Sequence, residues 1–319
     1  HGESKYIDCL ERTLYNGVIS GMSMDGGRFF YPNPLSSDGK YAFNADNTKT
    51  RQPWFGCACC PSNLCRFIPS VPGYLYGVKD NNIYVNLFAG NTSTIKVQGK
   101  DVVLEETTEY PWNGDIKISV KKSGVKNANL LVRIPGWVRN QVVPSDLYKY
   151  SDAENPAYSV TVNGKAVEAD LDANKGYLPV KNIKKGDVVR IHFDMPIRTV
   201  VANAKVADDK GKVAVERGPL VYCAEAVDNA NEPVLRAVMA KKPTFSLVDN
   251  YSIQNTETKG APAFSVKAIQ TDAQVLEEGA NSISVKNDKL TLIPYYAWNH
   301  RGANEMNVWF IQSLSMLDK

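Results

Sequence analysis

The sequence lacks the long runs of one residue class that mark several kinds of protein. Its 319 residues include 37 basic and 34 acidic side chains, for a net charge of +3, and no basic block is longer than a pair such as Lys121-Lys122. This balance argues against a nucleic acid or an anionic membrane surface as a partner. No stretch of about 18 apolar residues occurs, and the amino end is polar and helical, so we expect neither a transmembrane helix nor a signal core. The chain starts at His1 and not at methionine, which leaves an exported or periplasmic location of the complete protein open.

Histidine and cysteine are scarce as well. The three histidines form none of the spacings typical of metal-binding helices, and glycine-rich phosphate loops are absent. Six cysteines are too few and too clustered for a disulfide framework in a chain of this size. Cys9, Cys65 and Cys223 lie in segments with apolar periodicity, which predicts that they pack in the core.

Helical periodicity is confined to the amino-terminal quarter. Apolar residues recur at three- and four-residue spacing from Ser4 to Ile19, which predicts an amphipathic helix. Residues 25–56 contain many turn residues and little periodicity, as is typical of a structured loop or a short hairpin. Helical spacing returns at Pro61, a residue well suited to the first position of a helix, and Pro69 is expected to end or bend that helix early.

The remainder of the chain, from about Tyr76, alternates apolar and polar residues in short runs separated by Asn-Gly, Gly-Asp and proline-containing turns. About a dozen such runs, with hardly a helix among them, are typical of β-sandwiches or barrels. The predicted fold class is therefore mainly β, with two β-sandwich domains preceded by a helical segment. We expect the helical segment at 1–76, the first sandwich at 77–198 and the second at 199–307, with residues 308–319 available as a last strand of the first sandwich.

Half of the cysteines lie in the stretch WFGCACCPSN, at positions 57, 59 and 60. If Pro61 opens the helix, the thiols of Cys59 and Cys60 lie where unpaired backbone N–H groups and the helix dipole favour negative charge. A lowered thiol pKa is the usual precondition for a cysteine nucleophile or metal ligand. A disulfide between the adjacent pair is disfavoured because neighbouring Cα atoms are only about 3.8 Å apart, whereas a zinc ion would hold both sulfurs as thiolates. On chemistry alone, a metal or nucleophile role and a purely structural role both stay open.

Aromatic residues precede these thiols in the loop. Tyr31, Trp54 and Phe55 offer ring faces of the kind on which a sugar stacks. Packing in the core explains the same residues equally well. We therefore take them as candidates for substrate binding whose burial has to decide between the two roles.

Several separate segments occur in the order and character of one enzyme family. They are KYIDCLERTLYNGVISGMSMDGGRFFYPNPL, CCPSN, RIPGW, GKVAVERGPLVYC and LTLIPYYAWNHRGANEMNVWF, and they run from the first helix to the last strand of the chain. In these segments the chain resembles glycoside hydrolase family 127 and its close relatives. The resemblance implies a β-L-arabinofuranosidase that pairs an (α/α)6 barrel with two carboxy-terminal β-sandwich domains. It also implies that the helical segment 1–76 is a remnant of that barrel.

The resemblance assigns roles to individual residues. By position, Cys59 corresponds to the nucleophile that attacks the anomeric carbon in a retaining double displacement. Cys59 and Cys60 both correspond to ligands of a Zn²⁺ ion, and Tyr31 corresponds to a tyrosine near the sugar. We add Trp54 as a second substrate-binding candidate, for an arabinose-containing oligosaccharide or glycan. Cys57 is not part of the family pattern, and its role stays open.

The rest of the family's site is not in this chain. The other two zinc ligands, a glutamate and a cysteine, lie upstream in the family, as do the acid/base glutamate and the sugar-binding histidines. We therefore expect this polypeptide alone to be inactive as a hydrolase and to bind zinc weakly or not at all, because its partner, the missing amino-terminal half of the barrel, supplies these groups. The alternative is a non-catalytic β-sandwich module for carbohydrate binding or assembly, in which the cysteine cluster is structural.

Overall fold

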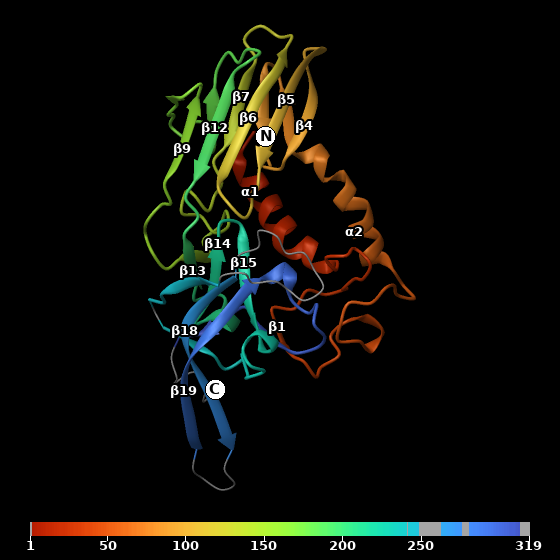
Figure 1. Ribbon diagram of the computed structural model, residues 1–319, viewed down its shortest axis with the longest axis vertical. Helices are drawn as coiled ribbons and strands as arrows, with labels where there is room; N and C mark the ends of the chain where they lie inside the picture. The colour runs from red at the N-terminus through yellow and green to blue at the C-terminus, as the bar shows by residue number, and fades with distance from the viewer. Residues whose placement is uncertain (1, 241, 249–262, 276–280, 313–319) are drawn as a thin grey trace. The chain divides into compact units, whose positions relative to one another are not determined.

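The computed structural model describes residues 2–240, 242–248, 263–275 and 281–312 (Figure 1). It is mainly β, with two short α-helices towards the amino end and several sheets, so the predicted fold class is confirmed. Among the described residues, no helix is long and apolar enough to span a membrane.

The chain divides into two compact units. Unit 1 consists of His1–Arg12, Arg66–Asp146 and Ala153–Pro196, and unit 2 consists of Thr13–Cys65, Leu147–Asp152 and Ile197–Lys319, each taken over its described residues. The boundaries that we expect at residues 76 and 198 stay a prediction. Residues 313–319, which we considered as part of a last strand, lie outside the described residues.

The first helical segment is less regular than its periodicity predicts. Helix α1 (Ser4–Arg12) continues as a π-helical turn, η1 (Thr13–Val18), and then as a 3₁₀ turn, η2 (Ile19–Gly21). Asn16 lies in the π-helical turn, where its side chain donates to the carbonyl of Pro219 and accepts from the amide of Val221. These bonds join the widened turn to a strand of unit 2.

Two sheets make up the β structure of unit 1. The four-stranded sheet has the order β11-β7-β3-β2, and the six-stranded sheet has the order β10-β9-β12-β6-β5-β4. The first comprises β2 (Tyr76–Lys79), β3 (Asn82–Val85), β7 (Asn129–Arg133) and β11 (Tyr177–Val180). The second comprises β4 (Asn91–Val97), β5 (Lys100–Thr108), β6 (Asp115–Ser123), β9 (Tyr158–Val162), β10 (Lys165–Ala166) and β12 (Val188–Phe193).

The core of unit 1 follows the period-two alternation of these strands. On β5, Val102 and Leu104 are fully buried while their neighbours are partly exposed, and β6 and β12 show the same alternation. Alternate side chains of a strand lie on opposite faces, so one apolar face of each strand enters the core. This is the pattern that the sequence predicts.

A buried ion cluster attaches α1 to the four-stranded sheet. Arg133, on β7, is completely buried, and its guanidinium donates to the carboxylates of Asp8 (2.7 Å) and Glu11. Tyr110 donates its hydroxyl to the same Glu11 carboxylate at 2.8 Å. Burial alone would lower the pKa of Arg133, but the two neighbouring carboxylates raise it, so the guanidinium stays charged.

A second buried carboxylate in unit 1 accepts its hydrogen bonds from neutral groups. Glu106, on β5, is 3% exposed and accepts hydrogen bonds from the Tyr76 hydroxyl (3.0 Å) and from the Ala89 amide (3.1 Å). Burial raises the pKa of Glu106 to about 8, because the charged form loses its hydration. A pKa raised in the folded state means that folding favours the protonated form.

We therefore expect the stability of unit 1 to fall as the pH rises. The contribution of Glu106 is complete below pH 4.5, the ordinary pKa of a glutamate side chain, and is lost as the pH approaches about 8. Glu106→Gln should remove this slope, since glutamine stays neutral at every pH. Urea denaturation at pH 5 and pH 8 measures the effect, with Glu105→Gln, an exposed neighbour, as the control. A wild-type slope that survives in Glu106→Gln would assign the pH dependence to another group.

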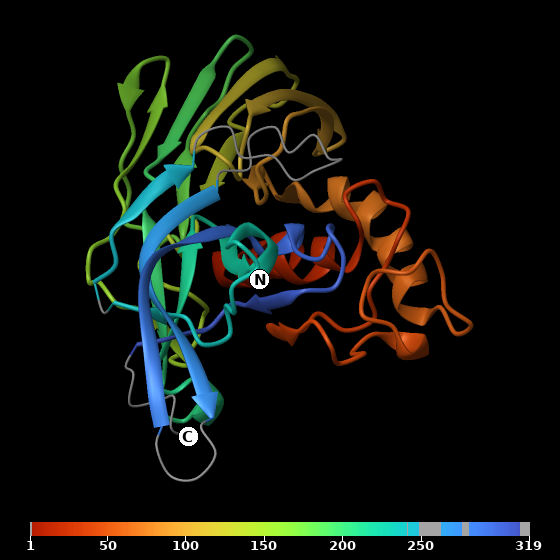
Figure 2. The same ribbon diagram turned by 60° about the horizontal axis from the view of Figure 1, so that its bottom comes forward.

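Unit 2 contains one branched sheet of eleven strands. Its order is β1-β20-β15-β19-β18-β16-β21-β14-β13-β8, with β17 paired to β18 and β14 also paired to β15. The strands are β1 (Ser36–Asp38), β8 (Tyr148–Tyr150), β13 (Ile197–Ala202), β14 (Lys212–Arg217), β15 (Leu220–Glu225), β16 (Val238–Met239), β17 (Phe245–Val248), β18 (Ala263–Val275), β19 (Asn281–Pro294), β20 (Glu305–Asn307) and β21 (Phe310–Ile311). Figure 2 shows β18 and β19 as a long antiparallel ribbon.

The loop before the second helix packs against the end of this sheet, as predicted for a structured loop. Phe30 and Phe43 stack on Trp298, a completely buried residue that follows the short helix η7 (Tyr295–Ala297). Arg51 lies over the ring of Phe30 and donates to the carbonyls of Ser20 (2.8 Å) and Trp298 (2.6 Å). These contacts fix the loop, which is itself part of unit 2, against the residues that follow η7.

The remaining helical elements are short. Helix α2 (Cys59–Ser70) leads into a 3₁₀ turn, η4 (Val71–Tyr74). Pro69 lies in the last turn of α2, and the helix ends one residue later, which is the predicted early end. The other 3₁₀ turns are η3 (Ala45–Asn47), η5 (Ala207–Asp209) and η6 (Ala226–Asp228).

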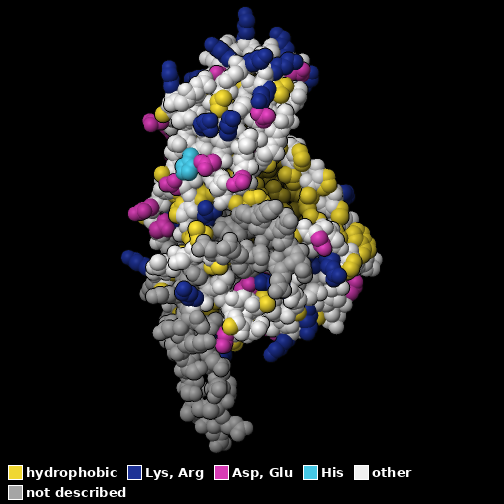
Figure 3. All heavy atoms as spheres, viewed as in Figure 1, with side chains coloured by type: hydrophobic (Ala, Val, Ile, Leu, Met, Phe, Trp, Pro, Cys, Tyr) yellow, Lys and Arg dark blue, Asp and Glu magenta, His cyan; other side chains and the backbone are white. Residues whose placement is uncertain are grey.

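The three isolated cysteines differ in burial. Cys223, on β15, is completely buried, as predicted, but Cys9 and Cys65 are exposed, so the prediction of core packing is wrong for these two. Apolar periodicity identifies a helix face but not whether another element covers it. Helix α2 buries only Pro61, and Figure 3 shows apolar side chains at the surface on the side where Figure 1 labels this helix.

Candidate functional site

The thiol pair lies at the start of α2, which begins two residues earlier than predicted. The helix begins at Cys59, and the amide of Ser62 already bonds to the carbonyl of Ala58, so the prediction that Pro61 is the first helical residue is wrong. Proline is tolerated here because the first four amides of a helix have no partner within it. Both thiols therefore belong to the first turn, where the helix dipole favours an anion.

Gly21 lets α2 approach the first helical segment closely. A Cβ atom at Gly21 would lie 2.9 Å from Cδ1 of Leu64, so a larger residue would force the Leu64 side chain to move. This contact lies within unit 2 and contributes to the position of the Cys59 turn.

Two groups approach the sulfur of Cys59. Its Sγ lies 3.9 Å from Sγ of Cys60 and 3.7 Å from the hydroxyl of Tyr31, to which the thiol donates a hydrogen bond. Once the thiol ionises, the hydroxyl becomes the donor and stabilises the thiolate. The structure thus brings together Tyr31, Cys59 and Cys60, three residues that the sequence predicts as site residues.

This geometry separates the pKa values of the two thiols. The hydrogen bond from Tyr31, followed by that from Cys60, lowers the pKa of Cys59. Burial, followed by the hydrogen bond to Cys59, raises the pKa of Cys60. Burial and the neighbouring thiol raise the pKa of Tyr31, which therefore stays a hydroxyl and can donate. The first proton to leave this cluster comes from Cys59.

Asn44 holds Tyr31 in place, and sequence reasoning missed it. The side chain of Asn44 is 4% exposed, accepts from the Tyr31 amide at 2.9 Å and donates to the carbonyl of Thr50 at 2.9 Å. The ring of Phe55 packs edge-on against the Tyr31 ring. An asparagine in a turn-rich loop carries no sequence signal that distinguishes this role from ordinary turn formation.

Burial separates the roles of the aromatic candidates. Phe55 is 4% exposed, which makes it a core residue. Trp54 is 54% exposed, and its contact with Phe29 is edge-to-face. Its ring therefore remains open to a ligand. Tyr31 has intermediate exposure and contacts the thiol.

The spacing of the two sulfurs fits a shared metal ion. Two thiolates of a tetrahedral zinc site lie about 3.8 Å apart when each Zn–S bond is about 2.3 Å, and the observed Sγ–Sγ distance is 3.9 Å. The described part of the chain contains no group of three or more His, Cys, Asp or Glu side chains able to hold a metal. Cys59 and Cys60 would therefore supply two ligands to such an ion, and the described residues hold no complete set.

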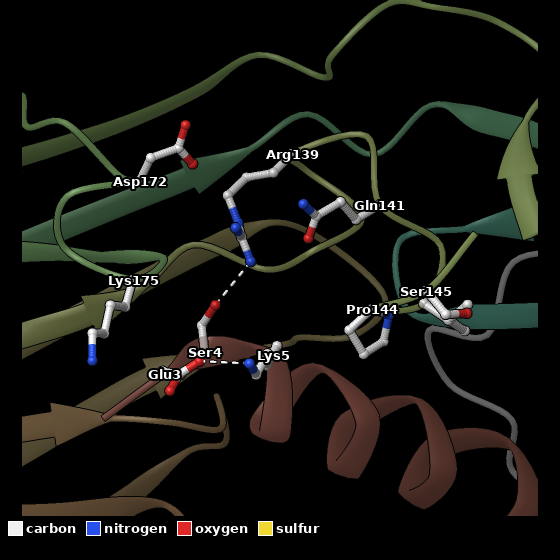
Figure 4. A pocket seen from close by; sticks show the side chains of 10 residues that line it. Glu3, Ser4, Lys5, Arg139, Gln141, Pro144, Ser145, Asp172 and Lys175 are labelled. Atoms are coloured by element: carbon white, nitrogen blue, oxygen red, sulfur yellow. Dashed lines mark hydrogen bonds and ion pairs between the residues drawn. The ribbon is translucent and has the colours of Figure 1, made fainter. Parts of the chain in front are cut away.

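A cavity of about 440 Å³ lies elsewhere, in unit 1, and has a polar, charged lining (Figure 4). Arg139 donates to the hydroxyl of Ser4 (2.8 Å) and to Asp8 (3.0 Å), and Lys5 pairs with Glu3 at 2.6 Å. None of the predicted site residues lines this cavity. The thiol cluster therefore remains the candidate for chemistry.

Nearly the whole length of the described chain matches the models of one carbohydrate-active enzyme family. The family model of the β-L-arabinofuranosidase GH127 catalytic domain matches residues 1–73, that of the GH127 middle domain matches 82–195, and that of the glycoside hydrolase family 127 C-terminal domain matches 197–311. The chain belongs to glycoside hydrolase family 127.

Individual relatives agree with this assignment. The non-reducing end β-L-arabinofuranosidase of Bifidobacterium longum subsp. longum is 32% identical over 321 residues, which cover 96% of this chain and 45% of the relative. A solved GH127 β-arabinofuranosidase, BT3674, is 49% identical with a TM-score of 0.88, over 99% of this chain and 47% of that one. The GH127 β-L-arabinofuranosidase Ara127N-Se of Geobacillus stearothermophilus T6 is 32% identical with a TM-score of 0.81, over 98% and 47%. The chain thus spans less than half the length of these relatives.

Replacing Tyr31 with phenylalanine is expected to raise the pKa of the Cys59 thiol, because the thiolate loses its main hydrogen-bond donor. Only the thiolate reacts with iodoacetamide, so alkylation of Cys59 should require a higher pH in Tyr31→Phe than in the wild type. Mass spectrometry of the metal-free chain reports the alkylation rate residue by residue. Tyr41→Phe, an exposed tyrosine of the same loop, is the matched control. Coinciding pH curves for Tyr31→Phe and the wild type would mean that the hydroxyl does not act on the thiolate.

Proposed function

We propose that this chain is the carboxy-terminal portion of a retaining glycoside hydrolase that removes β-L-arabinofuranosyl groups, with Cys59 as the nucleophile. The observation that supports this most directly is the contact of the Cys59 sulfur with both the Tyr31 hydroxyl and the Cys60 sulfur in the first turn of α2. A retaining glycosidase needs a nucleophile that is anionic at working pH and open to the sugar. Cys59 is exposed, and its surroundings lower its pKa.

The residues of this chain would act in two steps. The Cys59 thiolate attacks the anomeric carbon, the bond to the leaving-group oxygen breaks, and a thioglycosyl bond forms. Water then attacks the same carbon and releases Cys59, so two inversions give net retention. The proton donor to the leaving group is expected from outside this chain, because the family's acid/base glutamate lies upstream.

Cys59 and Cys60 would hold a zinc ion, which keeps the sulfur of Cys59 ionised at neutral pH. Tyr31 donates to the same sulfur and orients it. The exposed ring of Trp54 is placed in the same loop as Tyr31 and supplies a stacking face for a furanose ring.

The remaining site groups would come from the other half of the protein. The chain covers 45–47% of the length of its relatives, and the apolar side chains of α2, such as Leu64 and Phe67, are only partly buried, so a completed barrel could cover them. With two zinc ligands out of four, we infer that the chain alone binds zinc weakly and does not hydrolyse glycosides.

An assay of the longer protein and of this chain tests the proposal. The longer protein should release arabinose from an aryl β-L-arabinofuranoside, bind one equivalent of zinc by elemental analysis, and give the β-anomer first by NMR, while this chain alone should do none of these. If the longer protein is metal-free and hydrolyses no arabinofuranoside, but this chain binds arabinose-containing glycans, the molecule is a non-catalytic carbohydrate-binding module.

A further inference from the structure

The turns at one end of the two sheets of unit 1 bring together lysines that lie far apart in the sequence. Strands β2, β4, β6, β9 and β11 end there, and β3, β5, β7, β10 and β12 start there, as the registers of their pairs show. We call these turns the basic end, and they comprise residues 79–82, 96–101, 121–129, 162–165 and 180–188. Figure 3 shows dark blue side chains gathered at the top of the view, where Figure 1 draws the upper ends of β4, β5, β6 and β7.

The basic end has a large excess of positive charge. Its ten lysines are all exposed, and they are Lys79, Lys96, Lys100, Lys121, Lys122, Lys126, Lys165, Lys181, Lys184 and Lys185. Only three acidic residues, Asp80, Asp101 and Asp187, lie in the same turns, whereas the whole chain has an excess of only three positive charges.

Most of these lysines have no counter-charge within the chain. Lys96 and Lys122 pair with Asp101, and Lys121 pairs with Glu105 on β5. The other seven form no ion pair with any described residue. Like charges gathered at one end of a domain repel one another over about a Debye length, ~8 Å, and oppose the folded state. A bound polyanion would relieve this repulsion.

Asparagine side chains fix the turns relative to one another. Asn163 accepts from the amide of Val188 and donates to the carboxylate of Asp187, both at 2.9 Å. Asn129 accepts from the amide of Asn182 at 3.0 Å. The backbone that carries the lysines is therefore ordered before any ligand arrives, which lowers the entropic cost of binding.

We propose that the basic end binds an acidic polysaccharide, whose uronic acid carboxylates pair with the unpaired lysines. The choice of a glycan rests on the proposed function, because an enzyme that removes arabinosyl groups works on glycans. A lysine ammonium is a compact, hydrated point charge, which suits single carboxylates spaced along a chain. The basic end contains no arginine, whose planar fork suits phosphate, and no aromatic residue, on which a nucleic-acid base could stack or which could anchor a membrane surface.

Isothermal titration calorimetry of this chain with polygalacturonate tests the inference. We expect binding at about 50 mM salt and at least about a tenfold loss of affinity at about 200 mM, because ion pairs form at the expense of bound counterions. Fully methyl-esterified polygalacturonate, the matched polymer without carboxylate charge, should not bind. Failure of polygalacturonate to bind at the lower salt, or equal binding of the esterified polymer, would overturn the proposal. Tighter binding of a single-stranded oligonucleotide or of phosphatidylserine vesicles would overturn the choice of a glycan.

Two matched double variants locate the site. Lys184→Gln with Lys185→Gln removes two charges from the basic end, and Lys149→Gln with Lys210→Gln removes two exposed lysines of unit 2. The first pair should weaken polygalacturonate binding at least about fivefold, while the second should leave it unchanged. Equal weakening by both would mean that only the total charge matters.

Polygalacturonate binding requires no hydrolysis, so the two proposals can fail separately. A longer protein that binds polygalacturonate through the basic end but releases no arabinose would disprove the hydrolase and leave the binding surface in place. An active hydrolase whose affinity for polygalacturonate does not change in Lys184→Gln with Lys185→Gln would disprove the binding surface alone.

Discussion

Cys59→Ala in the longer protein should reduce kcat for an aryl β-L-arabinofuranoside by at least about 10⁴-fold, because removal of a covalent nucleophile leaves only binding and electrostatic contributions. The substitution removes one exposed sulfur atom at the first turn of α2, so the fold should not change. The measurement is a steady-state assay with circular dichroism to confirm folding.

The matched control for this variant is Cys65→Ala, another exposed cysteine of the same helix. It should keep wild-type kcat and KM. Hydrolysis by Cys59→Ala within tenfold of the wild type would contradict the nucleophile assignment. A loss of activity in Cys65→Ala as large as that in Cys59→Ala would instead indicate that α2 is sensitive to any substitution.

Arg133→Leu should destabilise unit 1 by about 3–5 kcal/mol, because it leaves the buried Glu11 carboxylate without its cation, while Asp8 keeps its contact with Arg139. Arg133 is completely buried and reaches Asp8, Glu11 and the carbonyl of Asn86. Since Asp8 and Glu11 belong to α1, the variant should also loosen this helix from β7. Urea denaturation followed by circular dichroism gives the free energy of unfolding, and hydrogen exchange of the α1 amides reports the local effect.

Lys96→Leu is the control for the loss of a surface pair. Lys96 bonds to Asp101 at 2.5 Å with a side chain that is 69% exposed, so its removal should cost less than about 1 kcal/mol. The double variant Arg133→Leu, Glu11→Leu should recover part of the loss, since it removes the stranded charge. Equal effects of Arg133→Leu and Lys96→Leu would mean that the buried cluster does not stabilise α1.

The extent to which the sequence predicts this site can be seen residue by residue. Clustering of Cys57, Cys59 and Cys60 before a proline was sufficient to predict thiols at a helix start, because proline positions and helix dipoles act locally. The first helical residue was predicted at Pro61 and lies at Cys59, since all unpaired amides of the first turn accommodate proline. The roles of Cys59 and Cys60 as nucleophile and zinc ligands stay predictions.

Contacts between distant residues were not predictable in the same way. Tyr31 touches a sulfur 28 positions further along the chain, and Asn44 fixes the Tyr31 amide across 13 positions. Both contacts depend on how the loop folds onto Trp298 and Arg51. Local sequence patterns carry no information about contacts between residues so far apart in the chain.

The sequence by itself determined the mainly β class, the alternation that places Val102 and Leu104 in the core, and the location of the thiols, because each follows from interactions among near neighbours. Only the tertiary structure decided that Cys9 and Cys65 are exposed while Cys223 is buried, and that Trp54 is open while Phe55 is packed. Burial depends on whether a second element covers a face, and that element is distant in sequence or belongs to another segment.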